Sequence, residues 1–138
     1  MPTVHQLSDL PGWAQQLLDE ARVGHLGLLD QSGHPRVQPV TFARVGETLV
    51  SAIDDKPKRR TPARIARLQA DPRATLTVDR YDDDWTRLAW VQVLAHATIT
   101  PISDDALEAL QARYPAYATP PPGPLIELRP LRVLCWRA

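Results

Sequence analysis

The sequence predicts a mainly β domain of the α+β kind, in which about six antiparallel strands form a barrel with small helices at its flanks. Short apolar runs rich in β-branched residues alternate with turns, and turns this short join antiparallel strands rather than parallel ones. The three- and four-residue apolar spacing of helices is confined to a few short stretches. Because the 138 residues show no internal repeat and no linker, we expect residues 1–138 to form a single domain.

The N-terminal half is predicted to begin with a helix. Apolar residues at helical spacing indicate an amphipathic helix over 10–22, with Asp9 as its cap, Pro11 in its first turn and Gly24 at its exit. The strands that follow are predicted over 25–30, 36–43 and 48–53. Turns at 31–34 and 44–47 would join them in an antiparallel meander.

The C-terminal half is predicted to hold a helix over 62–70, which begins with Thr61 as cap and Pro62 in the first helical position and ends at Asp71-Pro72. Later elements are strands over 74–79 and 87–100, a short helix capped by Ser103, an irregular proline-rich strap or lid from Tyr114 to Gly123, and a last strand over 125–136. Pro130 interrupts that strand, and a proline there implies a bulge or an edge.

The most unusual stretch lies between the predicted strand 48–53 and the predicted helix 62–70. Its cations are Lys56, Lys58, Arg59 and Arg60. They precede a helix N-terminus, where free backbone N–H groups and the helix dipole favour an anion, and Pro57 stiffens the loop. A phosphate site is one interpretation, and a solvated loop that binds nothing is the other.

The composition excludes several classes of function. Sixteen basic and sixteen acidic side chains cancel, so the chain has no global attraction to nucleic acid or to an anionic membrane. The basic run at 56–60 is a local feature, so a nuclear-targeting or DNA-contact role is a weaker alternative than the two interpretations above. Cys135 is the one cysteine, residues 1–6 are not a charged segment followed by an apolar run, and no apolar span approaches transmembrane length. We therefore expect a cytoplasmic protein.

No catalytic side chain can be named from a motif. Asp82-Asp83-Asp84 offers oxygen ligands for a hard metal ion, but three consecutive carboxylates do not converge easily on one ion, and a solvated loop is the better interpretation. The four histidines lack metal-ligand spacing, and no serine elbow, Walker loop or Rossmann fingerprint occurs. Cys135 is expected in the core. We therefore predict no metal site.

Trp85 and Trp90 lie close together in one loop-and-strand unit. They are compatible with a place in the core, with a wall against a flat aromatic ligand, and with a subunit interface, where tryptophan is enriched. The residues alone leave all three alternatives open.

The order of these motifs resembles a known family. A strand, Pro39-Val40-Thr41-Phe42, a second strand, Asp54-Asp55-Lys56-Pro57-Lys58-Arg59, a helix, Asp71-Pro72-Arg73 and a strand follow one another as in the flavin/deazaflavin oxidoreductases with the split β-barrel of pyridoxamine 5'-phosphate oxidase. The basic run and Tyr81-Asp82-Asp83-Asp84-Trp85 resemble the branch of this family that depends on coenzyme F420. The resemblance covers about residues 10 to 136, although Asp71 stands where members often carry Asn.

The resemblance implies a split barrel that forms a homodimer with two cofactor sites at the subunit interface. It implies that Lys56, Lys58 and Arg59 hold the cofactor phosphate. The residues it would place against the ring system are Gln38, Pro39, Val40, Thr41, Ser51, Ala52 and Ile53, with Trp85 and Trp90 approaching from the partner subunit. Arg60, Arg64 and Arg67 continue the positive charge beyond the phosphate site.

The predicted function is an oxidoreductase that transfers a hydride between reduced F420 and a small organic acceptor. In such an enzyme the protein supplies orientation, a dry pocket and phosphate anchoring. F420 is favoured over FMN because its longer anionic tail calls for more cations. An FMN-dependent oxidoreductase is the first alternative, and a non-catalytic protein that binds a flavin or deazaflavin is the second, since fold does not fix function.

Overall fold

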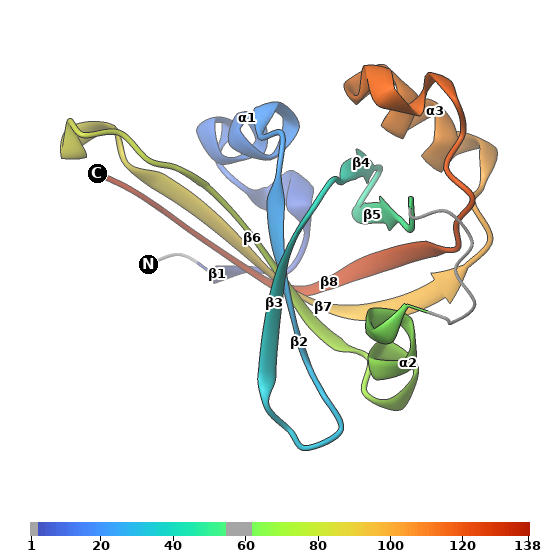
Figure 1. The fold of residues 1–138 in the computed structure, drawn as a ribbon. Helices are drawn as coiled ribbons and strands as arrows, with labels where there is room; N and C mark the ends of the chain where they lie inside the picture. The colour runs from blue at the N-terminus through green and yellow to red at the C-terminus, as the bar shows by residue number, and fades with distance from the viewer. Residues whose placement is uncertain (1–2, 55–61) are drawn as a thin grey trace.

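The computed structural model describes residues 3–54 and 62–138, and Figure 1 shows their arrangement. The strands are β1 (Thr3–Val4), β2 (Gly24–Leu29), β3 (Pro35–Val40), β4 (Ala43–Val45), β5 (Thr48–Ala52), β6 (Arg73–Arg80), β7 (Ala89–Thr100) and β8 (Leu125–Arg137). The helices are α1 (Gly12–Glu20), α2 (Ala63–Ala70) and α3 (Asp104–Arg113), with short 3₁₀ turns η1 (Leu7–Asp9), η2 (Trp85–Arg87) and η3 (Pro115–Ala118). No helix in this described part of the chain is long and apolar enough to cross a membrane.

The strands form one curved antiparallel sheet in the order β3-β2-β6-β7-β8-β5-β4, with β1 paired to β8. Strands β3 and β4 stand at the two ends of this order, so the sheet is not closed and the fold is a split barrel. In Figure 1, α1 and α3 lie above the long strands and α2 lies below them. The described residues contain eight strands rather than about six. One extra strand is β1, which was not predicted. The other arises because the predicted strand 36–43 is divided into β3 and β4.

The core consists of two apolar clusters. The larger lies on the concave face of the sheet, against α1 and α2, and contains the alternating residues Val91, Val93, Ala95 and Ala97 of β7. The predicted strand 87–100 thus contributes every second residue of β7 to this core. The smaller cluster lies under α3 and contains Leu110, Tyr114, Tyr117 and Leu125 among others.

The prediction of a single strand over 36–43 is wrong. β3 ends at Val40 and pairs with β2, whereas β4 begins at Ala43 and pairs with β5 at the other end of the strand order. Thr41 and Phe42 make the crossing between the two edges, and Phe42 is fully buried there. The apolar pattern runs unbroken through the crossing, so it carries no sign of the break. The predicted meander is therefore two separate hairpins.

The predicted ends of two helices also need correction. α1 begins after Pro11, and Asp9 lies in η1 instead of capping α1. Gly24 is the first residue of β2, where an added Cβ would come within 2.8 Å of Leu76 Cδ1, so close packing explains this glycine better than a helix exit does. Pro62 is the N-cap of α2, while Thr61 falls outside the described residues.

Two C-terminal predictions are confirmed. The Ser103 hydroxyl accepts the Ala106 N–H at 3.2 Å and so caps α3. In the β7–β8 ladder Leu94 pairs with Arg132 and Ala95 with Pro130, which leaves Leu131 as the extra residue of a bulge.

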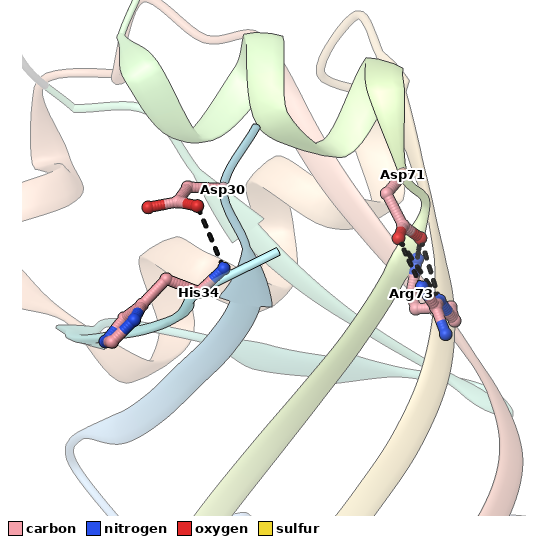
Figure 2. Close-up of polar contacts among 4 residues, drawn as sticks. All are labelled: Asp30, His34, Asp71 and Arg73. Atoms are coloured by element: carbon pink, nitrogen blue, oxygen red, sulfur yellow. Dashed lines mark hydrogen bonds and ion pairs between the residues drawn. The ribbon is translucent and has the colours of Figure 1, made fainter. Parts of the chain in front are cut away.

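Two carboxylates hold the ends of the neighbouring strands β2 and β6, and Figure 2 shows their contacts with His34 and Arg73. Asp30 accepts the backbone N–H groups of Ser32 and His34 at 2.9 and 3.0 Å in the β2–β3 turn. Asp71 joins the end of α2 to β6 through an ion pair of 2.6 Å with Arg73. Side-chain hydrogen bonds, from Ser32 to Asp30 and from Arg73 to Asp71, are the largest cause that lowers the pKa of each carboxyl to about 2.

Candidate functional site

A pocket of about 300 Å³ lies where β3 and β5 end and α2 begins. Its lining residues are Val23, Pro39, Val40, Thr41, Ser51, Ala52, Asp54 and Arg64. Six of these eight belong to the predicted cofactor-binding set, and these six come from three separate parts of the sequence: 39–41, 51–52 and 64. The fold therefore brings together a group of residues that the resemblance had associated with one ligand.

The crossing at Thr41 and Phe42 shapes this pocket. β3 and β5 are not neighbours in the sheet, yet the Ser51 hydroxyl donates a 2.7 Å hydrogen bond to the backbone oxygen of Thr41. Ser51 is the one buried polar residue on the described part of the chain, at 3% exposure, and this bond satisfies its hydroxyl. The bond holds the end of β5 against the crossing and so sets the width of the pocket.

A hydrogen-bond network around Tyr117, which is not itself a lining residue, joins two of the lining residues, and we call it the back wall. The Tyr117 hydroxyl lies 2.8 Å from Asp54 Oδ2 and 2.6 Å from Thr41 Oγ1. A phenol has one proton, so if Tyr117 donates to the carboxylate, Thr41 donates to Tyr117. Burial is the largest cause that raises the pKa of Tyr117 to about 12; the bond with Thr41 opposes the shift and Asp54 adds to it. Tyr117 therefore remains a protonated donor at neutral pH.

Arg64 is the cation that lines the pocket. Its Nη1 donates to Gln38 Oε1 at 3.4 Å, which places Gln38 beside the pocket although it is not one of the lining residues. The Arg64 Nε–H is buried and has no hydrogen-bond partner among residues 3–54 and 62–138. A buried N–H without a partner is costly, and an anionic oxygen in the pocket would satisfy it.

The pocket suits a ligand with a flat apolar part and an anionic part. Val23, Pro39, Val40 and Ala52 supply apolar walls, while the Arg64 guanidinium supplies a charged donor. A ring system with an attached phosphate or carboxylate, as in a flavin or deazaflavin, fits this donor set.

Of the remaining predicted site residues, some lie elsewhere and some fall outside the described part of the chain. Ile53 is in the larger core cluster, 2% exposed, and its side chain is not part of the pocket. Lys56, Lys58, Arg59 and Arg60 fall outside the described residues, between Asp54 and Pro62 in sequence. Their role stays a prediction.

Neither predicted tryptophan lines this pocket among the described residues. Trp85 is 69% exposed in η2, and Trp90 is half-buried on the convex face of the sheet. There Trp90 lines a broad hollow of about 790 Å³ together with His25, Gly27, Val37, Thr75, Thr77, Asp79 and Gln92.

Sequence reasoning missed Val23 and Tyr117, and it did not assign Asp54 to the site. The proline-rich segment that holds Tyr117 was predicted only to be a strap or lid. Two tyrosines three residues apart within that segment were an available signal, because buried tyrosines in irregular segments usually have hydrogen-bond partners.

The alternative chemistries find no support on the described residues. Asp82 accepts the Asp84 N–H at 2.8 Å and pairs with Arg87 at 3.4 Å, so it serves the turn before β7. The described residues contain no group of three side chains able to hold a metal ion. Cys135 is buried, as predicted, and burial raises the pKa of its thiol.

Comparison with known proteins gives one family and several similar structures. The family model described as pyridoxamine 5'-phosphate oxidase matches residues 10–137. No curated protein matches the chain. A heme-binding protein from Mycobacterium smegmatis is 22% identical with a TM-score of 0.72, over 92% of this chain and 55% of that one.

Two other structures match over nearly their whole length. An FAD-binding protein from Mesorhizobium loti is 18% identical with a TM-score of 0.65, over 97% of this chain and 95% of that one. An F420 reductase is 23% identical with a TM-score of 0.62, over 91% of this chain and 98% of that one. At these identities the likeness shows a shared fold.

Proposed function

The chain belongs to the pyridoxamine 5'-phosphate oxidase family, and on this premise we propose that it is an F420-dependent oxidoreductase that acts on a small organic acceptor. The observation that carries this proposal is the pocket at the β3–β4 crossing, in which apolar walls adjoin the Nε–H of Arg64, a donor without a partner on residues 3–54 and 62–138. The basic run from Lys56 to Arg60 follows Asp54 directly in sequence, and Asp54 lines the same pocket.

Each group of lining residues has a defined task in this proposal. Pro39, Val40 and Ala52 pack against a flat ring and exclude water from it. Arg64 binds an anionic group of the cofactor, and Gln38 orients the guanidinium. F420, when bound, supplies the hydride chemistry. The protein contributes binding and orientation, which agrees with the absence of a catalytic motif in the sequence.

FMN is the second candidate cofactor. It shares with F420 a tricyclic ring and a phosphate near the ribityl chain, so the apolar walls and one cation serve both. The number of cations favours F420, whose tail carries further anionic groups. Arg64 in the pocket and Arg67 on the same helix extend the charge beyond the four cations at 56–60. The same pocket would also suit a protein that binds such a cofactor without turnover.

A homodimer completes the proposal. The convex face of the sheet carries the half-buried Trp90 and Leu94 of β7, and beside them the exposed Val37, Leu131 and Trp136. None of the described helices covers the broad hollow at Trp90. A second copy of the chain, related by twofold symmetry, would bury these apolar groups and bring Trp85 and Trp90 to the partner's cofactor.

The test is to titrate the purified protein with F420, FMN and heme, and then to assay turnover. The proposal expects the tightest binding for F420, together with oxidation of reduced F420 by an enone or quinone acceptor that requires the protein. Tighter binding of FMN than of F420, together with turnover, would mean that the cofactor is FMN. Tight binding without turnover across a panel of acceptors would indicate a carrier, and failure of all three ligands to bind would overturn the proposal.

A further inference from the structure

The pocket holds two opposite charges that do not pair. Asp54 and Arg64 both line its small volume, yet they form no ion pair within 4.0 Å in the described structure. Two flexible charged side chains around one pocket would ordinarily be expected to come together, because an exposed pair of this kind is weakly favourable. Each side chain instead contacts another group: Asp54 contacts Tyr117, and Arg64 contacts Gln38.

Tyr117 provides the contact to Asp54. Its hydroxyl lies 2.8 Å from Asp54 Oδ2, and its ring is 5% exposed. The ring packs edge-on against Tyr114 at 5.6 Å between centroids, and Gln111 Nε2 donates to the Tyr117 backbone oxygen at 3.0 Å. The phenol is therefore fixed from α3 and η3, and it directs the Asp54 carboxylate toward the back wall.

Arg64 is correspondingly left available. Its Nη1 bonds to Gln38, and its Nε–H is buried without a partner among the described residues. Asp54 is the acidic residue among the described lining residues, and its carboxylate, if free to turn, would compete for this guanidinium. A ligand anion would then have to displace it.

We propose that Tyr117 is a positioning residue, which keeps the Asp54 carboxylate away from Arg64 and so reserves the guanidinium for an anionic oxygen of the ligand. The inference rests on the proposed function for the identity of that ligand, whose anion is a phosphate or a carboxylate. It does not depend on which ring system the pocket takes.

The first experiment uses inorganic phosphate as the probe and needs no cofactor. The Arg64 Nε–Hε resonance is assigned by its loss in Arg64→Lys, and its shift is followed as phosphate is added to the parent and to Tyr117→Phe, Asp54→Asn and the double variant. Asn keeps an acceptor oxygen for Tyr117 but removes the charge that would compete for Arg64.

We expect Tyr117→Phe to weaken phosphate binding about two- to fivefold, the size expected when an exposed ion pair competes. The double variant should recover the parent affinity, and Asp54→Asn alone should bind phosphate at least as well as the parent. A merely structural role for Tyr117 predicts no recovery in the double variant.

Three results would overturn the inference: undiminished phosphate affinity in Tyr117→Phe, no recovery in the double variant, or weaker binding in Asp54→Asn. Urea unfolding of each variant establishes that it is folded. If Tyr117→Phe does not fold, Tyr117→Met replaces it, because Met also lacks the hydroxyl that bonds Asp54 and its flexible side chain adapts to the space. A Tyr117→Met affinity equal to that of the parent, or one not recovered by Asp54→Asn, would then contradict the inference.

The second experiment measures the binding of F420 and of FMN to the same four proteins: the parent, Tyr117→Phe, Asp54→Asn and the double variant. Failure of both cofactors to bind the parent would overturn the proposed function while the phosphate result still decides the role of Tyr117. If the four proteins rank in the same order of affinity for a cofactor as for phosphate, the result supports both the proposed function and the role of Tyr117. Cofactor binding that is indifferent to Tyr117→Phe would place the ligand anion away from Arg64 and overturn the inference alone.

Discussion

The hydroxyl of Tyr114 accepts the backbone N–H of Phe42 at 3.1 Å and lies 3.0 Å from the backbone oxygen of the same residue. Phe42 lies where the chain leaves β3 for β4, so its backbone has no partner in a strand ladder. The hydroxyl of Tyr114, at the end of α3, takes the place of that partner. The crossing that shapes the pocket is thus secured by a residue more than seventy positions away.

Replacing Tyr114 by Phe should destabilise the protein by about 1–3 kcal/mol, because the backbone groups of Phe42 would be left buried without a partner. Urea unfolding measures the change. Tyr81→Phe is the matched control, since Tyr81 is 69% exposed, and it should stay within about 0.5 kcal/mol of the parent. Equal stability of the two variants would contradict this account of the crossing.

Acid stability should depend on Asp30 and Asp71. The folded state holds both carboxyls at a pKa of about 2, below their ordinary value of 3.8, so between these values the unfolded state binds more protons. The stabilisation is fully present above about pH 4 and is lost as the pH falls through about 2. The unfolding midpoint in urea, compared at about pH 5 and about pH 2.5, should fall less for Asp30→Asn/Asp71→Asn than for the parent. A parallel fall in both proteins would contradict the assignment.

Anchoring of the phosphate by Lys56 and Lys58 is a prediction from the sequence. Replacing both by Ala should weaken cofactor binding tenfold or more, on the order of 1.4 kcal/mol per decade, since charge-assisted bonds to phosphate are among the stronger ones. Titration of the cofactor measures the change, and Arg129→Ala, which removes an exposed cation from β8, is the control. Undiminished affinity in the double variant would refute the anchoring role.

The proposed dimer predicts that Leu94→Glu dissociates the protein. The new carboxylate would lie on the convex face beside Trp90, where burial against a second copy would be costly. Sedimentation should show the parent at twice the chain mass and the variant at the 15.4 kDa of one chain. Ala112→Glu, on the exposed side of α3, should remain dimeric. A parent that sediments as a single chain at micromolar concentration would rule the dimer out.

Most of the fold follows from local patterns. The strands β6 and β7, the cap at Ser103 and the bulge beside Pro130 are each set by neighbouring residues, and each was predicted. The break at Thr41 is different. Its cause is the pairing of β3 and β4 with different strands, and an unbroken apolar pattern gives no sign of a change of partner.

The site was predictable to a similar extent. The order of motifs pointed to the strand ends at Pro39 and Ser51 and to Arg64, which the structure brings around one pocket. The back wall was not predicted, because Tyr117 reaches it from a segment more than sixty residues beyond Asp54. Such a contact depends on how α3 packs over β4, which the local sequence does not reveal.

The most direct test of the central claim is a competition between F420 and FMN for the purified protein at equal concentration, followed by absorbance and repeated with Arg64→Ala. The account predicts that F420 remains bound, that Arg64→Ala weakens it more than it weakens FMN, and that reduced F420 is then oxidised by an acceptor only when the protein is present. Displacement of F420 by FMN, with no dependence on Arg64, would contradict the account and leave a flavin protein in its place.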